Sequence, residues 1–198
     1  MSESWYRQPT LEGIRVRLEP LAPEHAPQLL AAVDDADAIF RWTSAVIRDL
    51  DDAEAFVRTA VADTDRLAYA VVDTRTGSVV GTTSYYLIDP AHRKLVIGHT
   101  WLSRSAQGTG INAESKLLLL RRAFEDLDAV RVEWHTDERN AHSRGAIAKL
   151  GAEFEGLMRK HRRRRDGSWR TTALFAMTDD DWPAARARLE ARVADLPS

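Results

Sequence analysis

A short glycine-rich loop carries the clearest chemical signal in the sequence. Gly108 and Gly110 lie between a strand predicted over Lys94–Leu102 and a helix. That helix is predicted from apolar residues spaced four, three and four apart, namely Ala113, Leu117, Leu120 and Phe124. Glycine has no Cβ, so the backbone turns freely and can approach a ligand. A helix start adds unpaired N–H groups and a positive dipole end, which favour an anion. These residue types and their spacing therefore predict a phosphate-binding loop.

Two other interpretations of this loop stay open at the level of sequence. Residues 108–113 fit the G-x-G-x-x-A pattern of a dinucleotide-binding turn, and Glu133 lies near the usual place of its acidic residue. Against this, several polar residues separate Leu102 from the first glycine, and little chain follows for further βα units. The Walker A pattern is absent. The plainest alternative is a strand–loop–helix connection in which glycine only forms a turn.

The composition excludes several other classes of protein. The chain has 198 residues, 44% hydrophobic and 29% charged, and a net charge of −2, which predicts one domain without an overall nucleic-acid or membrane footprint. Because it has no cysteine, disulfides, thiolate metal sites and a cysteine nucleophile are excluded. Residues 1–9 lack the apolar core of a signal peptide, and no apolar run is long enough to span a membrane. We therefore expect a cytoplasmic protein without a bound metal.

Periodicity and turn signals predict the elements that position the loop. Strands are expected over residues 13–18, 67–73, 79–87, 94–102, 130–136, 154–165 and 170–177. Helices are expected over residues 23–33, within 137–151 and over 179–193. Two more are expected, one that Asp51–Asp52 caps and one that follows the glycine loop. This order predicts an α/β (α+β) fold, with a mixed, mostly antiparallel sheet of about seven strands flanked by helices. We interpret residues 1–198 as one domain, with an N-terminal arm over 1–12, a C-terminal helix over 181–198 and an aromatic loop over 39–44 near a pocket.

The sequence contains a set of short motifs: Ile97-Gly-His-Thr-Trp-Leu102, Gly108-Thr-Gly-Ile-Asn-Ala-Glu-Ser-Lys116, Arg131-Val-Glu133, Thr136-Asp-Glu-Arg-Asn140, Ser143, Lys149-Leu-Gly-Ala152 and Arg159-Lys-His161. Taken in this order and spacing, they resemble the GNAT N-acetyltransferase superfamily, in particular its RimJ/RimL-like branch, and the resemblance runs from about Gly13 to Trp182. The resemblance implies a GNAT-like fold with acetyl-CoA as the acetyl donor. It also implies direct transfer of the acetyl group to a primary amine, either a protein N-terminus or a small molecule.

The same resemblance implies which residues bind the CoA moiety. The pyrophosphate is expected on the loop amides, the pantetheine along the end of the preceding strand, and the CoA arm beside two residues that follow the next strand. The pyrophosphate residues are Gln107, Gly108, Thr109, Gly110, Ile111 and Asn112. The pantetheine residues are Trp101, Leu102 and Ser103, and the residues beside the CoA arm are Asn140 and Ser143. Two positions depart from the family pattern. Val96 replaces a glutamate often considered for proton handling, and Ser105 replaces a glutamine or arginine.

Acyl transfer from a thioester to an amine needs a neutral nucleophile, a stabilised oxyanion and a proton for the departing thiolate. A strand that diverges from its neighbour at Trp101–Leu102 would leave a backbone N–H free for the oxyanion. Ser143 is the candidate proton donor, with CoA binding as its alternative role. His99 is the candidate base, with a structural role as its alternative, and strand alternation predicts that it faces away from Val96. Further candidates on the neighbouring strand are Tyr85, Tyr86 and Asp89.

A basic run, Lys160-His-Arg-Arg-Arg-Arg165, is interpreted as a solvated strand of a hairpin whose arginines could attract an acidic substrate or the CoA 3′-phosphate. Binding to nucleic acid or to a membrane is not expected, and a homodimer is compatible with the sequence. Two other functions remain: a non-catalytic CoA-binding sensor or scaffold, which Val96 permits, and a small dinucleotide-binding module. The identity of the amine acceptor is not encoded in a recognisable motif.

Overall fold

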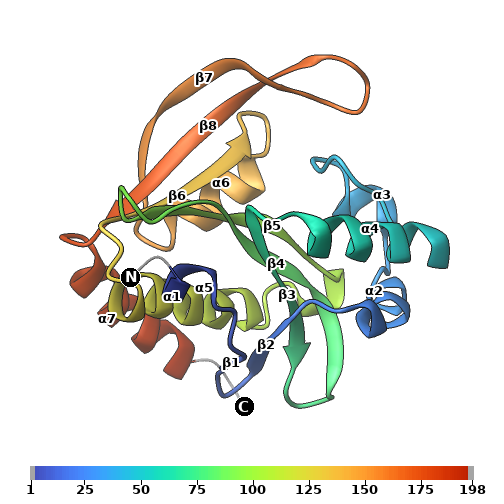
Figure 1. Cartoon of the computed structure of the whole chain (residues 1–198), viewed down its shortest axis with the longest axis horizontal. Coiled ribbons are helices and arrows are strands. Elements are labelled where there is room, and N and C mark those ends of the chain that lie inside the picture. Colours follow the sequence, from blue (N-terminus) through green and yellow to red (C-terminus); the bar gives the residue numbers. More distant parts are fainter. Residues whose placement is uncertain (1–2, 196–198) are drawn as a thin grey trace.

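An eight-stranded sheet organises the protein, as the computed structural model of residues 3–195 shows (Figure 1). The strand order is β1-β2-β3-β4-β5-β6-β8-β7, and the pair β5–β6 is parallel whereas the other pairs are antiparallel. The strands are β1 Leu11–Glu12, β2 Val16–Pro20, β3 Arg66–Asp73, β4 Ser78–Asp89, β5 Lys94–Leu102, β6 Arg131–Asp137, β7 Glu153–Arg163 and β8 Trp169–Thr178. The mixed, mostly antiparallel sheet predicted from the sequence is confirmed, with β1 as one strand more than expected.

Helices cover both faces of this sheet (Figure 1). They are α1 Glu3–Tyr6, α2 Ala26–Ala31, α3 Ala36–Ile39, α4 Leu50–Ala62, α5 Ile111–Arg121, α6 Ala141–Ala148 and α7 Trp182–Ala194. Tighter 3₁₀ turns span Pro23–His25 and Arg104–Ala106, and a wider π turn over Arg122–Asp126 extends α5. One face carries the packed pair α5 and α7, and the other carries α2 and α4. The glycine loop predicted from the sequence enters α5.

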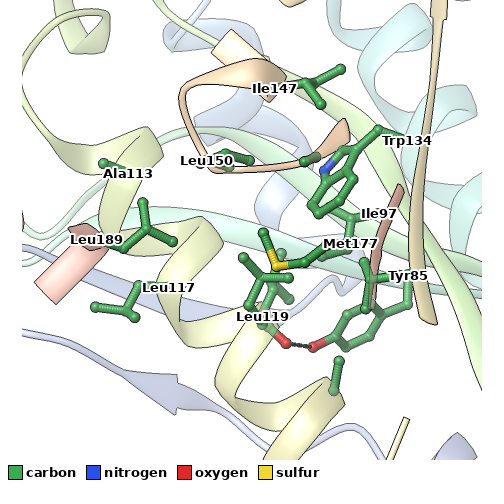
Figure 2. Close-up of a cluster of buried hydrophobic side chains, with 14 of the residues drawn as sticks. Tyr85, Ile97, Ala113, Leu117, Leu119, Trp134, Ile147, Leu150, Met177 and Leu189 are labelled. Carbon is green, nitrogen blue, oxygen red and sulfur yellow. Dashed lines mark hydrogen bonds between the residues drawn. The ribbon is translucent and has the colours of Figure 1, made fainter. Parts of the chain in front are cut away.

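Alternation along the strands separates two hydrophobic cores. In β3, Tyr69 and Val71 face the core under α5 and α7, whereas Ala68 and Ala70 face the core under α2 and α4. Figure 2 shows the first core, with Tyr85, Ile97, Trp134 and Met177 from four strands packed around Leu119 of α5. The Tyr85 hydroxyl donates to the Leu119 carbonyl, so the one polar atom of that side chain is paired. Burial of each large side chain stabilises the fold by about 1.5–3 kcal/mol, which fixes α5 against the sheet.

The first residues of the chain are attached to both ends of α5. Glu114 is buried, and its two carboxylate oxygens accept the backbone N–H groups of Ile14 and Arg15, each at 2.8 Å. At the other end, the buried guanidinium of Arg122 donates to the carbonyl of Arg7. Because buried charges need partners, these contacts lock the arm and the β1–β2 turn onto the helix.

Most predicted elements are confirmed, and a few boundaries are wrong. The first long strand starts at Val16 rather than Gly13, because Gly13 forms a turn by donating its N–H to the Val16 carbonyl. The cap of α4 is Asp49, which accepts the Asp52 N–H at 2.8 Å, and not Asp51–Asp52. The segments expected over 1–12 and 181–198 extend into residues 1–2 and 196–198, which lie outside the described residues.

Two features are absent from the part of the chain that the structure describes. None of the helices between residues 3 and 195 is long and apolar enough to cross a membrane. Within the same range, no group of three or more histidine, aspartate or glutamate side chains is arranged to hold a metal ion.

Candidate active site

Strands β5 and β6 separate near the middle of the sheet. They pair in parallel only at Lys94–Arg131, Leu95–Val132 and Val96–Glu133. Beyond Val96, no strand among the described residues pairs with the backbone of β5 on its β6 side. The separation therefore starts several residues before Trp101–Leu102, where the sequence indicated it, and leaves a longer stretch of strand backbone available to a ligand.

A β-bulge at His99 distorts β5 on the side where it pairs with β4. Thr82 lies opposite Trp101 and Ser84 opposite Gly98, so the two residues His99 and Thr100 face only Thr83. His99 has a φ angle of 48°, in the left-handed region that non-glycine residues seldom adopt. Such a residue reverses the usual alternation of side chains along the strand.

Because of this bulge, the prediction that His99 faces away from Val96 is wrong. Val96 lies directly opposite Tyr86 on β4, so both side chains share one face of the sheet. The Tyr86 ring also contacts the His99 ring in an edge-on arrangement with centroids 4.8 Å apart. All three side chains therefore lie on the face that carries α2 and α4.

The surroundings of His99 keep its imidazole neutral. Desolvation by neighbouring groups, followed by the positive charges of Arg66 and Arg162, lowers its pKa to about 4, although part of the residue remains exposed. The carboxylate of Asp63 opposes this shift without reversing it. A neutral imidazole can accept a hydrogen bond at pH 7, but the same two arginines disfavour the imidazolium that a general base must form.

The glycine loop has the geometry of an anion-binding helix start. Gly108 and Gly110 have φ angles of 80° and 93°, and a Cβ added at Gly108 would meet no atom within 4 Å. Gly110 is the N-cap of α5 and has no side chain that could cap the helix. The N–H groups of the first turn therefore face outward without a side-chain acceptor from the N-cap. Gln107 differs from its neighbours, because its N–H donates to the Arg104 carbonyl and its side chain to the Leu102 carbonyl at 3.2 Å.

The other loop residues are placed as follows. Thr109 donates its hydroxyl to the Ala106 carbonyl at 2.7 Å, and Ser103 caps the 3₁₀ turn by accepting the Ala106 N–H. Ile111 is buried in the core under α5. The side-chain oxygen of Asn112 is buried and accepts no hydrogen bond from the described residues, so a ligand or ordered water can donate to it.

The side chains of Trp101 and Leu102 are buried, so these residues present mainly backbone to the opening between β5 and β6. Trp101 packs edge-on against Phe40 with ring centroids 5.2 Å apart, and Leu102 joins the core under α5. Phe40 lies in the segment 39–44 that was interpreted as a loop near a pocket. Its carbonyl also accepts a hydrogen bond from Arg165 at 3.0 Å, which joins the tip of the β7–β8 hairpin to the end of α3.

Asn140 and Ser143 come together at the start of α6. The Asn140 side chain accepts the Ser143 N–H at 3.1 Å and caps the helix. These two residues follow β6, on the other side of the strand separation from the glycine loop. No hydrogen bond joins Ser143 to His99 within residues 3–195, so the two catalytic candidates do not form a directly linked pair.

A buried lysine lies behind the bulge and was missed by the sequence analysis. Lys116 is 4% exposed, and its ammonium donates to the hydroxyls of Thr83 at 2.9 Å and Thr100 at 2.8 Å. Burial lowers its pKa to about 7. Lys116 comes from α5, beneath the sheet and away from His99, so it supports the bulge rather than reaching an acceptor. The feature of the sequence that could have indicated it is a charged residue next to the apolar positions Ala113, Leu117 and Leu120 of the predicted helix.

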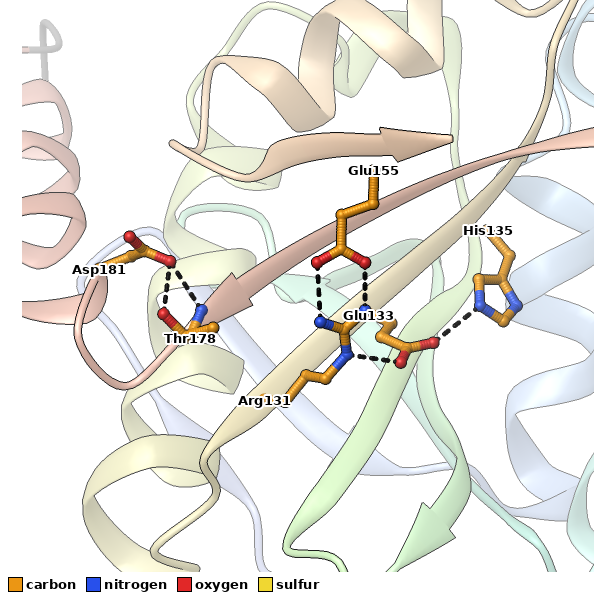
Figure 3. Close-up of polar contacts among 6 residues, drawn as sticks. All are labelled: Arg131, Glu133, His135, Glu155, Thr178 and Asp181. Carbon is orange, nitrogen blue, oxygen red and sulfur yellow. Dashed lines mark hydrogen bonds and ion pairs between the residues drawn. The ribbon is translucent and has the colours of Figure 1, made fainter. Parts of the chain in front are cut away.

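Glu133 does not have the environment of a ribose-binding residue. Its carboxylate accepts hydrogen bonds from Arg131 at 2.7 Å and pairs with His135 at 3.0 Å (Figure 3). The contact with His135, together with Arg131, lowers the pKa of Glu133 to about 2 against an opposing effect of burial. This carboxylate is therefore ionised and already paired, which counts against the dinucleotide interpretation.

A shallow hollow of about 330 Å³ lies beside the loop and is lined by Leu30, Val33, Asp34, Asp35, Ala36, Asp37, Ile47 and Arg48. Asp34 accepts the N–H groups of Arg104 and Ser105 at 2.9 and 3.1 Å. This pairing ties the α2–α3 connection to the loop after β5. We do not assign the chemistry to this hollow, because Asp34 and Asp35 are already hydrogen-bonded and His99 is not part of its lining.

The acetyltransferase (GNAT) domain model matches residues 15–153 of this chain. No match was found among curated proteins. Among solved structures, a protein from T. thermophilus assigned as an acetyltransferase is 37% identical, with 95% of this chain and 98% of that chain covered and a TM-score of 0.87.

Two further solved structures extend the comparison. A GCN5-related N-acetyltransferase from Brucella melitensis is 31% identical, with a TM-score of 0.90 and coverage of 96% of this chain and 87% of that one. Mycobacterium smegmatis RimJ, solved in complex with CoA-disulfide, is 23% identical, covers 96% of each chain and has a TM-score of 0.79. The similarity to RimJ shows a shared fold.

Proposed function

Since the chain belongs to the acetyltransferase (GNAT) domain family, we propose that it is an acetyl-CoA-dependent N-acetyltransferase that moves an acetyl group directly to a primary amine. Family membership supports acetyl transfer and the use of acetyl-CoA. The observation that carries the finer proposal is the combination of a strand separation at Val96–Glu133 with an uncapped helix start at Gly110. A phosphate-bearing arm can bind the helix start while its other end reaches between the strands.

The residues around the loop fit this co-substrate. The N–H groups from Gly108 to Ile111 would hold the pyrophosphate, whereas the Gln107 N–H is already bonded. The backbone of Trp101–Ser103 would line the pantetheine, with Asn140 and Ser143 on the opposite side. When bound, acetyl-CoA supplies the acetyl thioester.

In direct transfer, the amine nitrogen forms a bond to the acetyl carbon and the carbon–sulfur bond breaks. The nitrogen loses one proton and the departing thiolate gains one. We propose that the Ser143 hydroxyl donates the second proton, since a thiol has a pKa of about 8.5 and needs only a weak donor. His99 is neutral at pH 7, and its lowered pKa makes it a weak base. The amine therefore reaches the site already neutral through its own ionisation in solvent. Water takes the proton that the nitrogen loses after attack, and water returns a proton to the Ser143 oxygen.

Thioester cleavage with a panel of amines tests the proposal. The protein has no cysteine, so a thiol reagent reads released CoA without background from the enzyme. We expect CoA release that depends on the amine, with the acetylated amine identified by mass spectrometry. Tight CoA binding without turnover of any amine would instead support the sensor or scaffold function that Val96 permits.

The RimJ/RimL-like branch stays a proposal, and peptides with free N-terminal amines belong in the same panel for that reason. Acetylation of a peptide α-amine in preference to small amines would support this branch. A cytoplasmic location and a homodimer likewise remain predictions from the sequence.

A further inference from the structure

One face of the sheet next to His99 gathers three arginines that lack a carboxylate partner. Arg66 lies opposite Tyr86 in the β3–β4 pair, and Arg170 lies opposite Arg162 in the β7–β8 pair. The Arg162 guanidinium lies 6.0 Å from the centre of the Tyr86 ring. Within residues 3–195, none of the three arginines forms an ion pair with an acidic side chain within 4.0 Å. We call Arg66, Arg162 and Arg170 the arginine cluster.

The carboxylates around this cluster are largely engaged elsewhere. Glu133 is held between Arg131 and His135 (Figure 3). Asp137 accepts two hydrogen bonds from Arg164, at 2.7 and 3.1 Å. Asp63, at the exposed end of α4, acts on Arg66 only over a longer distance. The cluster therefore keeps an excess of positive charge.

Within the part of the chain that the structure describes, several nitrogens on this face are buried and have no hydrogen-bond partner. They are Nη2 of Arg66, Nε of Arg170 and Nδ1 of His135. Arg66 is only partly satisfied, since its Nε donates to the Ser84 hydroxyl at 2.9 Å. Desolvation lowers the pKa of Arg66 to about 10, which still leaves it charged at pH 7. Buried polar groups in folded proteins are normally paired, so these nitrogens are donors and acceptors that a bound anion or ordered water can engage.

The cluster lies next to the point where the amine must arrive. Tyr86 contacts both Arg162 and the ring of His99, and His99 forms the bulge before Trp101. The hairpin that carries Arg162 and Arg170 is joined to the end of α3 through Arg165 and Phe40. This connection across the face favours an acceptor of small size.

We propose that the acceptor is a small amine that carries an anionic group, a carboxylate or a phosphate, bound by the arginine cluster while its nitrogen approaches the thioester. The inference rests on the proposed acetyl transfer and specifies its substrate class. Planar guanidinium groups bind both oxyanions in a bidentate manner, so the two groups share one recognition chemistry. Polyamines are excluded by the same charge, because like charges repel in a partly desolvated site.

Matched acceptors test the substrate class directly. An α-amino acid is compared with its methyl ester, and an aminoalkyl phosphate with the corresponding amino alcohol, through CoA release. The anionic member of at least one pair is expected to have a kcat/KM at least tenfold higher than its neutral partner. The pair with the larger ratio identifies carboxylate or phosphate as the group that is bound.

Two exposed arginines on neighbouring positions of β7 provide a matched variant and control. Arg162→Gln removes a member of the cluster, whereas Arg163→Gln removes an arginine that stacks on Trp169 at 4.6 Å, outside the cluster. Arg162→Gln should raise KM for the anionic acceptor at least tenfold and leave KM for acetyl-CoA and kcat/KM for the neutral partner unchanged. Arg163→Gln should change none of them.

The outcomes separate this inference from the proposed function. Faster acetylation of neutral amines or polyamines than of anionic ones would overturn the inference and leave acetyl transfer in place. The inference would also be overturned if Arg162→Gln changed kcat/KM equally for the anionic and the neutral acceptors. Absence of amine-dependent CoA release across the whole panel would overturn the proposed function itself.

Discussion

Replacement of Lys116 by methionine should change how protein stability depends on pH. Methionine keeps a similar length and apolar stem but cannot bind a proton. The hydroxyls of Thr83 and Thr100 lie 2.8 Å apart, so they can remain hydrogen-bonded to each other in the variant. The substitution thus removes a buried titratable group without leaving both of its partners unsatisfied.

The size of the effect follows from the two pKa values of this lysine. Its pKa is 10.5 ordinarily and about 7 in the folded protein. Between these values the unfolded chain binds more protons than the folded chain, so the free energy of unfolding rises with pH. Burial of the charged Lys116 destabilises the folded protein fully below pH 7, and this cost disappears as the pH approaches 10.5. From pH 7 to pH 9, the linkage relation gives a gain of about 2 kcal/mol for the wild type.

Urea denaturation at half-unit steps from pH 6 to pH 9 measures this gain. The difference in free energy of unfolding between Lys116→Met and the wild type should favour the variant most at pH 6–7 and shrink by about 2 kcal/mol by pH 9. Other groups titrate equally in both proteins and cancel in the difference. Lys149→Met, at an exposed lysine, is the control and should give a flat difference. A flat difference for Lys116→Met as well would refute the reasoning that burial lowers the pKa of this lysine.

Three further predictions concern the loop, proton transfer and the basic hairpin. Gly110→Val should weaken CoA binding at least tenfold by calorimetry, because a β-branched residue disfavours its φ of 93°. Gly167→Val, at a φ of 79° in the β7–β8 turn and outside the glycine loop, should leave affinity unchanged. Ser143→Ala should lower kcat more than it raises KM. For an α-amine acceptor, log kcat/KM should rise with unit slope to about pH 8. The profile should show no ionisation near pH 6.5, so His99→Gln should leave its shape unchanged. A normal kcat in Ser143→Ala would show that Ser143 is not the proton donor and only binds CoA. Duplex DNA should not bind at physiological salt despite residues 162–165, and a steep salt-dependent affinity in a gel-shift assay would contradict this.

Local patterns predicted the elements around the loop well. The limits of β5 were predicted correctly, and α5 follows the glycines as its apolar spacing indicated. These features depend on residues close together in sequence, where turn chemistry and periodicity act directly. The order of elements also predicted a mixed sheet, since short connections leave few ways to arrange them.

Features that depend on pairing between distant strands could not be predicted. The bulge at His99 appears only when β5 is paired with β4, and it reverses the expected face of that histidine. The arginine cluster combines one residue of β3 with two residues of the β7–β8 hairpin, which meet only through the sheet register. The depth of Lys116 likewise depends on how α5 packs on the sheet, because a lysine on a helix is usually solvated.

The contacts of Glu114 and Arg122 have a practical consequence for recombinant work on this protein. Removal of the chain up to and including Arg15 would leave a buried carboxylate without the Ile14 and Arg15 amides and a buried guanidinium without the Arg7 carbonyl. Both orphaned charges belong to the segment that continues from the glycine loop. A shortened version would therefore lose affinity at a site far along the chain from the deletion, and a purification tag is better attached through a linker ahead of an intact arm.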